Sequence, residues 1–117
     1  MSLVAIVSTD LLVVSRVADA AQRAGHSVVR VDRPSGLPPP VAISMVLVDW
    51  GARESDWGTS LSAWLASASE RPRLVVFGPH TDLAAHAEAR EAGIGPMQAR
   101  SKVLPTLTTI LEGASAP

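Results

Sequence analysis

The run Met45-Val46-Leu47-Val48-Asp49 decides the fold. Four apolar residues without a polar interruption predict a short strand that is buried on both faces, which is typical of a parallel sheet covered by helices on both sides. Similar runs occupy residues 3–7 and 74–77, before and after it in the chain. The sequence therefore predicts an α/β fold.

Amphipathic segments separate most of these strands. Residues 11–23 carry apolar side chains at helical spacing, and Asp10 before them is a favoured helix N-cap residue. Comparable segments follow Asp56, Thr81 and Ser101, which we expect to cap three further helices.

The connection after a second predicted strand, residues 27–31, is different. Residues 32–40 contain four prolines and a glycine, which excludes a long helix there. We also predict a short fifth strand at 96–99. The alternation of strands and helices along the chain then indicates one doubly wound parallel sheet, with the strands in the flavodoxin-like order 2-1-3-4-5. We expect one domain over residues 1–112 and a disordered tail at 113–117.

Composition excludes several function classes. The chain has no cysteine, so it has no zinc–thiolate site, iron–sulfur cluster or thiol nucleophile. Its net charge of −1 gives no electrostatic signature for nucleic acid or an anionic membrane. The apolar residues 1–14 lack a basic start and are interrupted by Ser8-Thr9-Asp10, so they resemble neither a signal peptide nor a membrane span. We expect a cytoplasmic protein that binds neither nucleic acid nor membranes.

The carboxyl ends of parallel strands meet at one edge of a sheet, where α/β proteins place their functional crevice. Polar or small residues follow the predicted strands at this edge. The candidate crevice residues are Ser8, Thr9, Asp10, Asp49, Gly78 and Lys102.

With these positions, the chain resembles the receiver domain of bacterial two-component response regulators over residues 3–111. In that family an acidic pair after the first strand binds Mg²⁺, and an aspartate closing the third strand accepts the phosphoryl group. A Thr or Ser closes the fourth strand, and a lysine follows the fifth. The resemblance implies that Asp49 corresponds to the phosphoacceptor and that Lys102 lies close to the position of the lysine.

The other positions depart from the family. Ser8 and Thr9 replace the acidic pair, and Asp10 comes one place later. This removes about two negative charges from the site of a cation that prefers carboxylate oxygens. Gly78 has no hydroxyl to follow a phosphoryl group. We therefore expect a pseudo-receiver without a cofactor. The alternative is an orthodox receiver in which Asp49 and Asp10 hold Mg²⁺.

Individual residues leave alternatives open. Asp49 equally fits a loop-anchoring carboxylate, Asp10 fits a helix cap, and Lys102 fits either a partner of Asp49 or a solvated residue. Trp50 is a candidate partner contact, or packs on a neighbouring loop.

No nucleophile and base stand at a credible spacing, so we expect no enzyme. The partner is expected to be a protein or a second copy, bound through helix 82–92, strand 96–99 and the last helix. A flavodoxin-like domain for a small ligand or nucleotide is the second alternative, although no glycine-rich loop follows the first strand.

Overall fold

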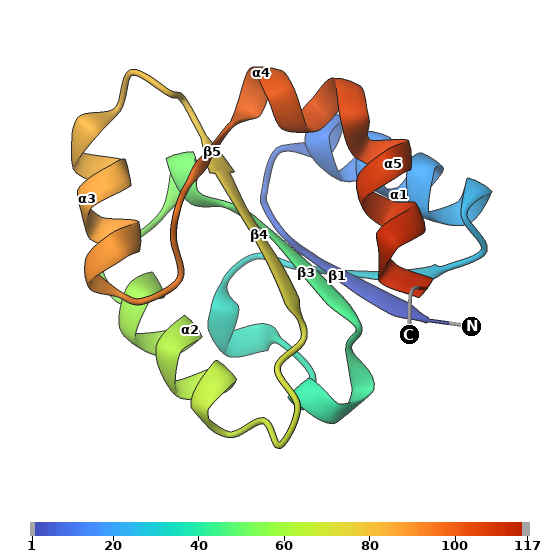
Figure 1. Cartoon of the computed structure of the whole chain (residues 1–117), viewed down its shortest axis with the longest axis horizontal. Coiled ribbons are helices and arrows are strands. Elements are labelled where there is room, and N and C mark those ends of the chain that lie inside the picture. Colours follow the sequence, from blue (N-terminus) through green and yellow to red (C-terminus); the bar gives the residue numbers. More distant parts are fainter. Residues whose placement is uncertain (1, 116–117) are drawn as a thin grey trace.

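The computed structural model describes residues 2–115 and contains one five-stranded parallel sheet in the order β2-β1-β3-β4-β5 (Figure 1). This confirms the predicted α/β class and strand order. The strands are β1 (Leu3–Val7), β2 (Ser27–Val31), β3 (Met45–Asp49), β4 (Arg73–Gly78) and β5 (Gln98–Ala99). Every residue of β3 is buried, as the apolar run 45–48 predicts for all of them except Asp49.

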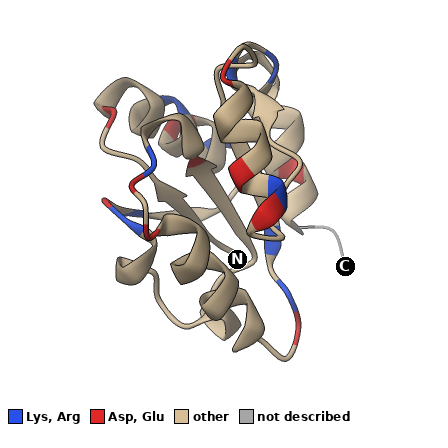
Figure 2. Ribbon diagram, turned by 90° about the vertical axis from the view of Figure 1, so that its left-hand side faces the viewer, with Lys and Arg blue, Asp and Glu red and all other residues tan. Residues whose placement is uncertain are grey.

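Helices cover both faces of the sheet. One face carries α1 and the C-terminal helices, and the other carries α2 and α3 (Figure 1). The helices are α1 (Leu11–Arg23), α2 (Trp57–Ala66), α3 (Leu83–Glu91), α4 (Arg100–Val103) and α5 (Leu107–Glu112). Figure 2 shows the charged residues mostly on helices and loops, with few on the strands. Within residues 2–115, no helix combines the length and apolar character needed to cross a membrane.

The proline-rich connection from β2 to β3 contains two 3₁₀ turns, η1 (Pro34–Gly36) and η2 (Pro40–Ala42), in place of an α-helix. The predicted loss of this helix is confirmed. Prolines stand early in both turns because the first residues of a helical turn need no amide donor.

Two helix starts differ from the prediction. Asp82, rather than Thr81, caps α3, because its carboxylate accepts a hydrogen bond from the Ala85 amide at 3.0 Å. The last helical segment begins at Arg100, rather than after a Ser101 cap. A 3₁₀ turn at Leu104–Thr106 around Pro105 divides that segment into α4 and α5.

The C-terminal residues form a final 3₁₀ turn, Gly113–Ser115, and residues 116–117 lie outside the described part. The expectation of a disordered tail at 113–117 stays a prediction.

Candidate functional site

Asp49 closes β3 at the carboxyl edge, and its side chain is only 3% exposed. Ser8, which follows β1, is fully buried beside it, and the Ser8 hydroxyl donates a hydrogen bond of 2.8 Å to Oδ2 of Asp49. The Ser8 Oγ also accepts a hydrogen bond of 3.1 Å from the Asp10 amide. The fold thus brings together two predicted crevice residues, but as a buried polar pair.

Asp10 is engaged on both carboxylate oxygens. Its Oδ1 accepts hydrogen bonds from the Leu12 and Val13 amides at 3.0 and 3.4 Å, which confirms its role as the N-cap of α1. Its Oδ2 accepts a hydrogen bond of 2.9 Å from Arg100. The Arg100 guanidinium, with the Val13 amide second, lowers the pKa of the Asp10 carboxyl below its usual range.

Two arginines contact the crevice residues. Arg100, the first residue after β5, pairs with Asp10, and Arg30 donates a hydrogen bond of 3.3 Å to the Ser8 carbonyl. Lys102 is exposed on α4, and within the described residues no ion pair joins it to Asp49. Sequence reasoning favoured the only lysine of the chain, although Arg100 directly follows the predicted strand. The strand register identifies Arg100. Ala99 pairs with Gly78 at the carboxyl ends of β5 and β4, so the next residue, Arg100, lies at that edge of the sheet.

Gly78 stands where the loop after β3 lies against the end of β4. A Cβ at Gly78 would lie 2.8 Å from the Met97 sulfur and 3.2 Å from the Gly51 nitrogen. In the opposite direction, a Cβ at Gly51 would lie 2.8 Å from Cδ of Pro79. The two glycines allow this close approach, and a Cβ at position 78 would require the Met97 side chain and the Gly51 backbone to shift.

Of the two interpretations that the sequence leaves open for Trp50, the structure supports packing inside the molecule and not a partner contact. Its side chain is 2% exposed, and its indole donates a hydrogen bond of 2.9 Å to the Ala85 carbonyl on α3. The Arg53 guanidinium lies 5.7 Å from the indole centroid and forms ion pairs with Asp82 and Glu88. These contacts fasten the loop after Asp49 to α3, and the buried indole is not free to contact a partner.

The residues present do not fit a Mg²⁺ site of the receiver kind. Mg²⁺ needs several oxygen ligands in near-octahedral geometry. Oδ2 of Asp49 is held by Ser8, and both oxygens of Asp10 are held by backbone amides and Arg100. Among residues 2–115, no group of three or more acidic or histidine side chains lies close enough to hold a metal ion.

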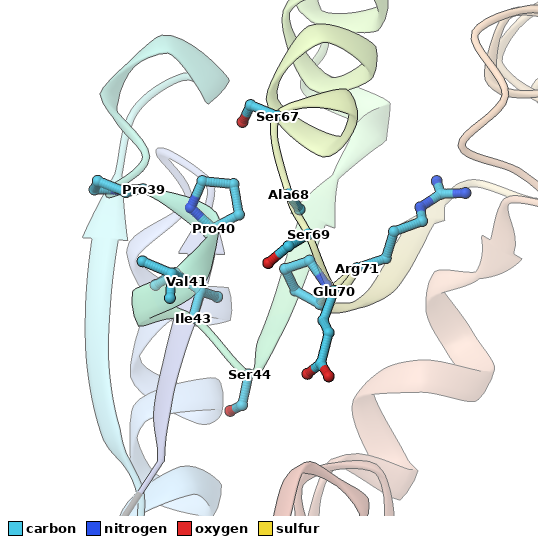
Figure 3. Close-up of a pocket in the computed structure, with 11 residues that line it drawn as sticks. Pro39, Pro40, Val41, Ile43, Ser44, Ser67, Ala68, Ser69, Glu70 and Arg71 are labelled. Atoms are coloured by element: carbon cyan, nitrogen blue, oxygen red, sulfur yellow. The ribbon is translucent and has the colours of Figure 1, made fainter.

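A pocket of about 800 Å³ lies at the opposite edge of the sheet, and Asp49 is not among its lining residues. Figure 3 shows η2 and the loop after α2 facing each other across it. This space is distinct from the crevice that the sequence predicts.

Comparison with known proteins identifies the fold. No family model matches the chain, and no curated protein matches it. A response regulator from Hahella chejuensis superposes with a TM-score of 0.73 at 11% identity, covering 99% of this chain and 96% of that chain. A response regulator receiver domain from Clostridium thermocellum gives 0.72 at 13% identity, covering 97% and 94%. A protein assigned to pilus assembly in Burkholderia thailandensis gives 0.68 at 17% identity over the whole of both chains.

The chain has the fold of response regulator receiver domains. At these identities the likeness establishes the fold alone. The chemistry depends on the residues at the carboxyl edge.

Proposed function

We propose that the chain is a non-enzymatic, receiver-like interaction module that is not switched by phosphorylation of Asp49. The observation that carries this proposal is the buried hydrogen bond between Ser8 and Asp49. It uses one oxygen of the carboxylate that would have to attack a phosphodonor.

The geometric and electrostatic requirements of phosphoryl transfer support the same conclusion. An attacking carboxylate must reach the phosphorus in line with the leaving group, and a metal ion and a cation offset the charge that gathers there. Asp49 is nearly closed to solvent, and its neighbour Ser8 is neutral. Asp10 is the acidic residue nearest to Ser8 in the sequence, and its charge is already neutralised by Arg100.

The readout of a phosphoryl group is also missing. In the receiver fold, a hydroxyl at the end of β4 would move toward the modified aspartate. Gly78 has none, and Met97 and Gly51 fill the space beside it. A modified Asp49 would therefore lack the first contact through which a conformational change could spread.

The partner is proposed to be another protein or a second copy, bound over α3, β5 and α5. Leu83 at the start of α3 is 78% exposed. Light scattering over a range of concentrations tests the self-association. A mass that stays monomeric up to millimolar concentration would leave a different protein as the proposed partner.

Phosphodonor reactivity tests the main proposal. The protein is incubated with acetyl phosphate or beryllofluoride and Mg²⁺, beside an orthodox receiver domain as positive control. Intact mass and ¹⁹F NMR are then recorded. We expect no stoichiometric adduct with this chain. An adduct that disappears in Asp49→Asn would contradict the proposal and establish the orthodox receiver instead.

A gain-of-function variant sharpens the test. Ser8→Asp combined with Thr9→Asp restores the acidic pair of the family and removes the hydroxyl that binds Asp49. Mg²⁺-dependent beryllofluoride binding by this variant, but not by the wild type, would assign the loss of chemistry to these two positions.

A further inference from the structure

A different pocket, of about 470 Å³, lies at the carboxyl edge, and the buried Asp49 does not line it. It lies between the loop after β4, the first half of α1, and the α4–η4 segment. Its apolar wall consists of Pro79, Leu104 and Pro105. Ligands of open α/β sheets bind outside the carboxyl ends of the strands, and the pocket lies at that edge, beside the ends of β4 and β5.

Polar side chains line the same pocket. Arg16 on α1 is exposed, and within residues 2–115 its side chain has no ion pair or hydrogen bond. The side chains of Ser101 and His80 also lack partners in that part of the chain. Arg100, by contrast, is neutralised by Asp10. The pocket therefore offers one uncompensated guanidinium together with further hydrogen-bonding side chains.

We propose that this pocket binds a small organic anion that carries one carboxylate or phosphate group on an apolar body. The guanidinium of Arg16 matches the geometry of either anionic group. Pro79, Leu104 and Pro105 offer apolar surface for the body of the ligand. The volume lies within the range of small-molecule sites, which are mostly apolar with a few polar groups that fix orientation.

The site is independent of the phosphoacceptor position. Neither Asp49 nor Ser8 lines it, and it requires no metal ion. The proposal therefore goes beyond the proposed function, since it adds a ligand to a module that is not phosphorylated.

An NMR titration of the full chain tests the site with four probes: octanoate, octyl phosphate, 1-octanol and inorganic phosphate. Octanoate and octyl phosphate should each shift the amide signals of residues 80 and 100–104. Comparing these two distinguishes a carboxylate ligand from a phosphate ligand. 1-Octanol, which carries no charge, and inorganic phosphate, which has no apolar chain, should each bind more weakly than octanoate or octyl phosphate.

Two arginine variants on one helix give a matched control. Arg16→Gln should weaken octanoate binding about fivefold, the upper range for an exposed charge pair. Arg23→Gln removes the same charge at the other end of α1, where Arg23 pairs with Asp19, and should leave binding unchanged. Equal binding of octanol and octanoate, equal losses in both variants, or signal shifts confined to other regions would each overturn the proposal.

Discussion

The two halves of the carboxyl edge differ in what their polar groups contact. Around β1 and β3, Ser8, Asp10 and Asp49 bind each other, the backbone, Arg30 or Arg100, and the loop after Asp49 lies against β4. Around the α1–α4 pocket, Arg16 and Ser101 face an apolar wall without partners among the described residues. One edge thus contains a closed half, in which polar groups stabilise the fold, and an open half, in which they remain free to bind.

The closed half depends most on Trp50. Trp50→Ala should lower the free energy of unfolding by about 3–5 kcal/mol, because it leaves a cavity under the loop and removes the hydrogen bond to Ala85. The exposed control Leu83→Ala should change it by less than about 0.5 kcal/mol. Urea denaturation followed by tryptophan-independent circular dichroism measures both. Similar losses in the two variants would show that the loop is not packed as described.

Restoring the hydroxyl of the receiver family tests whether the closed half has room for it. Gly78→Thr should cost about 3 kcal/mol of unfolding free energy, the upper range for overpacking, since two neighbours lie within 3.2 Å of the new Cβ. Adding Met97→Ala should recover part of that loss. A Gly78→Thr protein as stable as the wild type in urea denaturation would contradict the close contact.

Removing the Ser8 hydroxyl tests the buried pair itself. Ser8→Ala should lower the unfolding free energy by about 2 kcal/mol, because Oδ2 of Asp49 loses its donor in a buried setting. Ser67→Ala is the matched control, since its hydroxyl bonds the Trp64 carbonyl at an exposed helix end and should matter little. Chemical denaturation measures the unfolding free energy of both variants. Equal losses would contradict the expected difference between the buried and the exposed serine.

The smallest expected effect is the contribution of the Asp10–Arg100 ion pair to stability, and it depends on pH. The pKa of Asp10 is lowered in the folded protein, chiefly by Arg100, so the ionised pair stabilises the fold above the ordinary value of 3.8. That contribution is lost as the pH falls through the lowered pKa. The melting temperatures of wild type and Arg100→Gln should therefore differ at neutral pH and converge in acid. A difference that persists at the acid end would assign the effect of Arg100 to packing.

Much of the fold could be predicted from local sequence. The apolar runs fixed the central strands, the prolines excluded one helix, and Asp10 was recognisable as a cap. The start of α3 was wrong by one residue, because Thr81 and Asp82 are both favoured cap types and only the carboxylate of Asp82 reaches the Ala85 amide.

The candidate site was predicted less completely. The sequence left Trp50 open between a partner contact and packing on a neighbouring loop, and only the structure shows that its indole packs between the sheet and α3. The approach of Gly51 to Gly78 was also missed, since it joins two loops that no local pattern relates.

The sequence by itself determined the strands, the missing helix and the placing of polar residues at one edge, because these follow from periodicity and backbone restrictions of neighbouring residues. The tertiary structure alone decided how those polar residues are used. Ser8 meets Asp49 across 41 positions, and Asp10 meets Arg100 across 90. Whether a carboxylate is buried, paired or open to a ligand depends on such distant partners, and they become neighbours only when the sheet has formed.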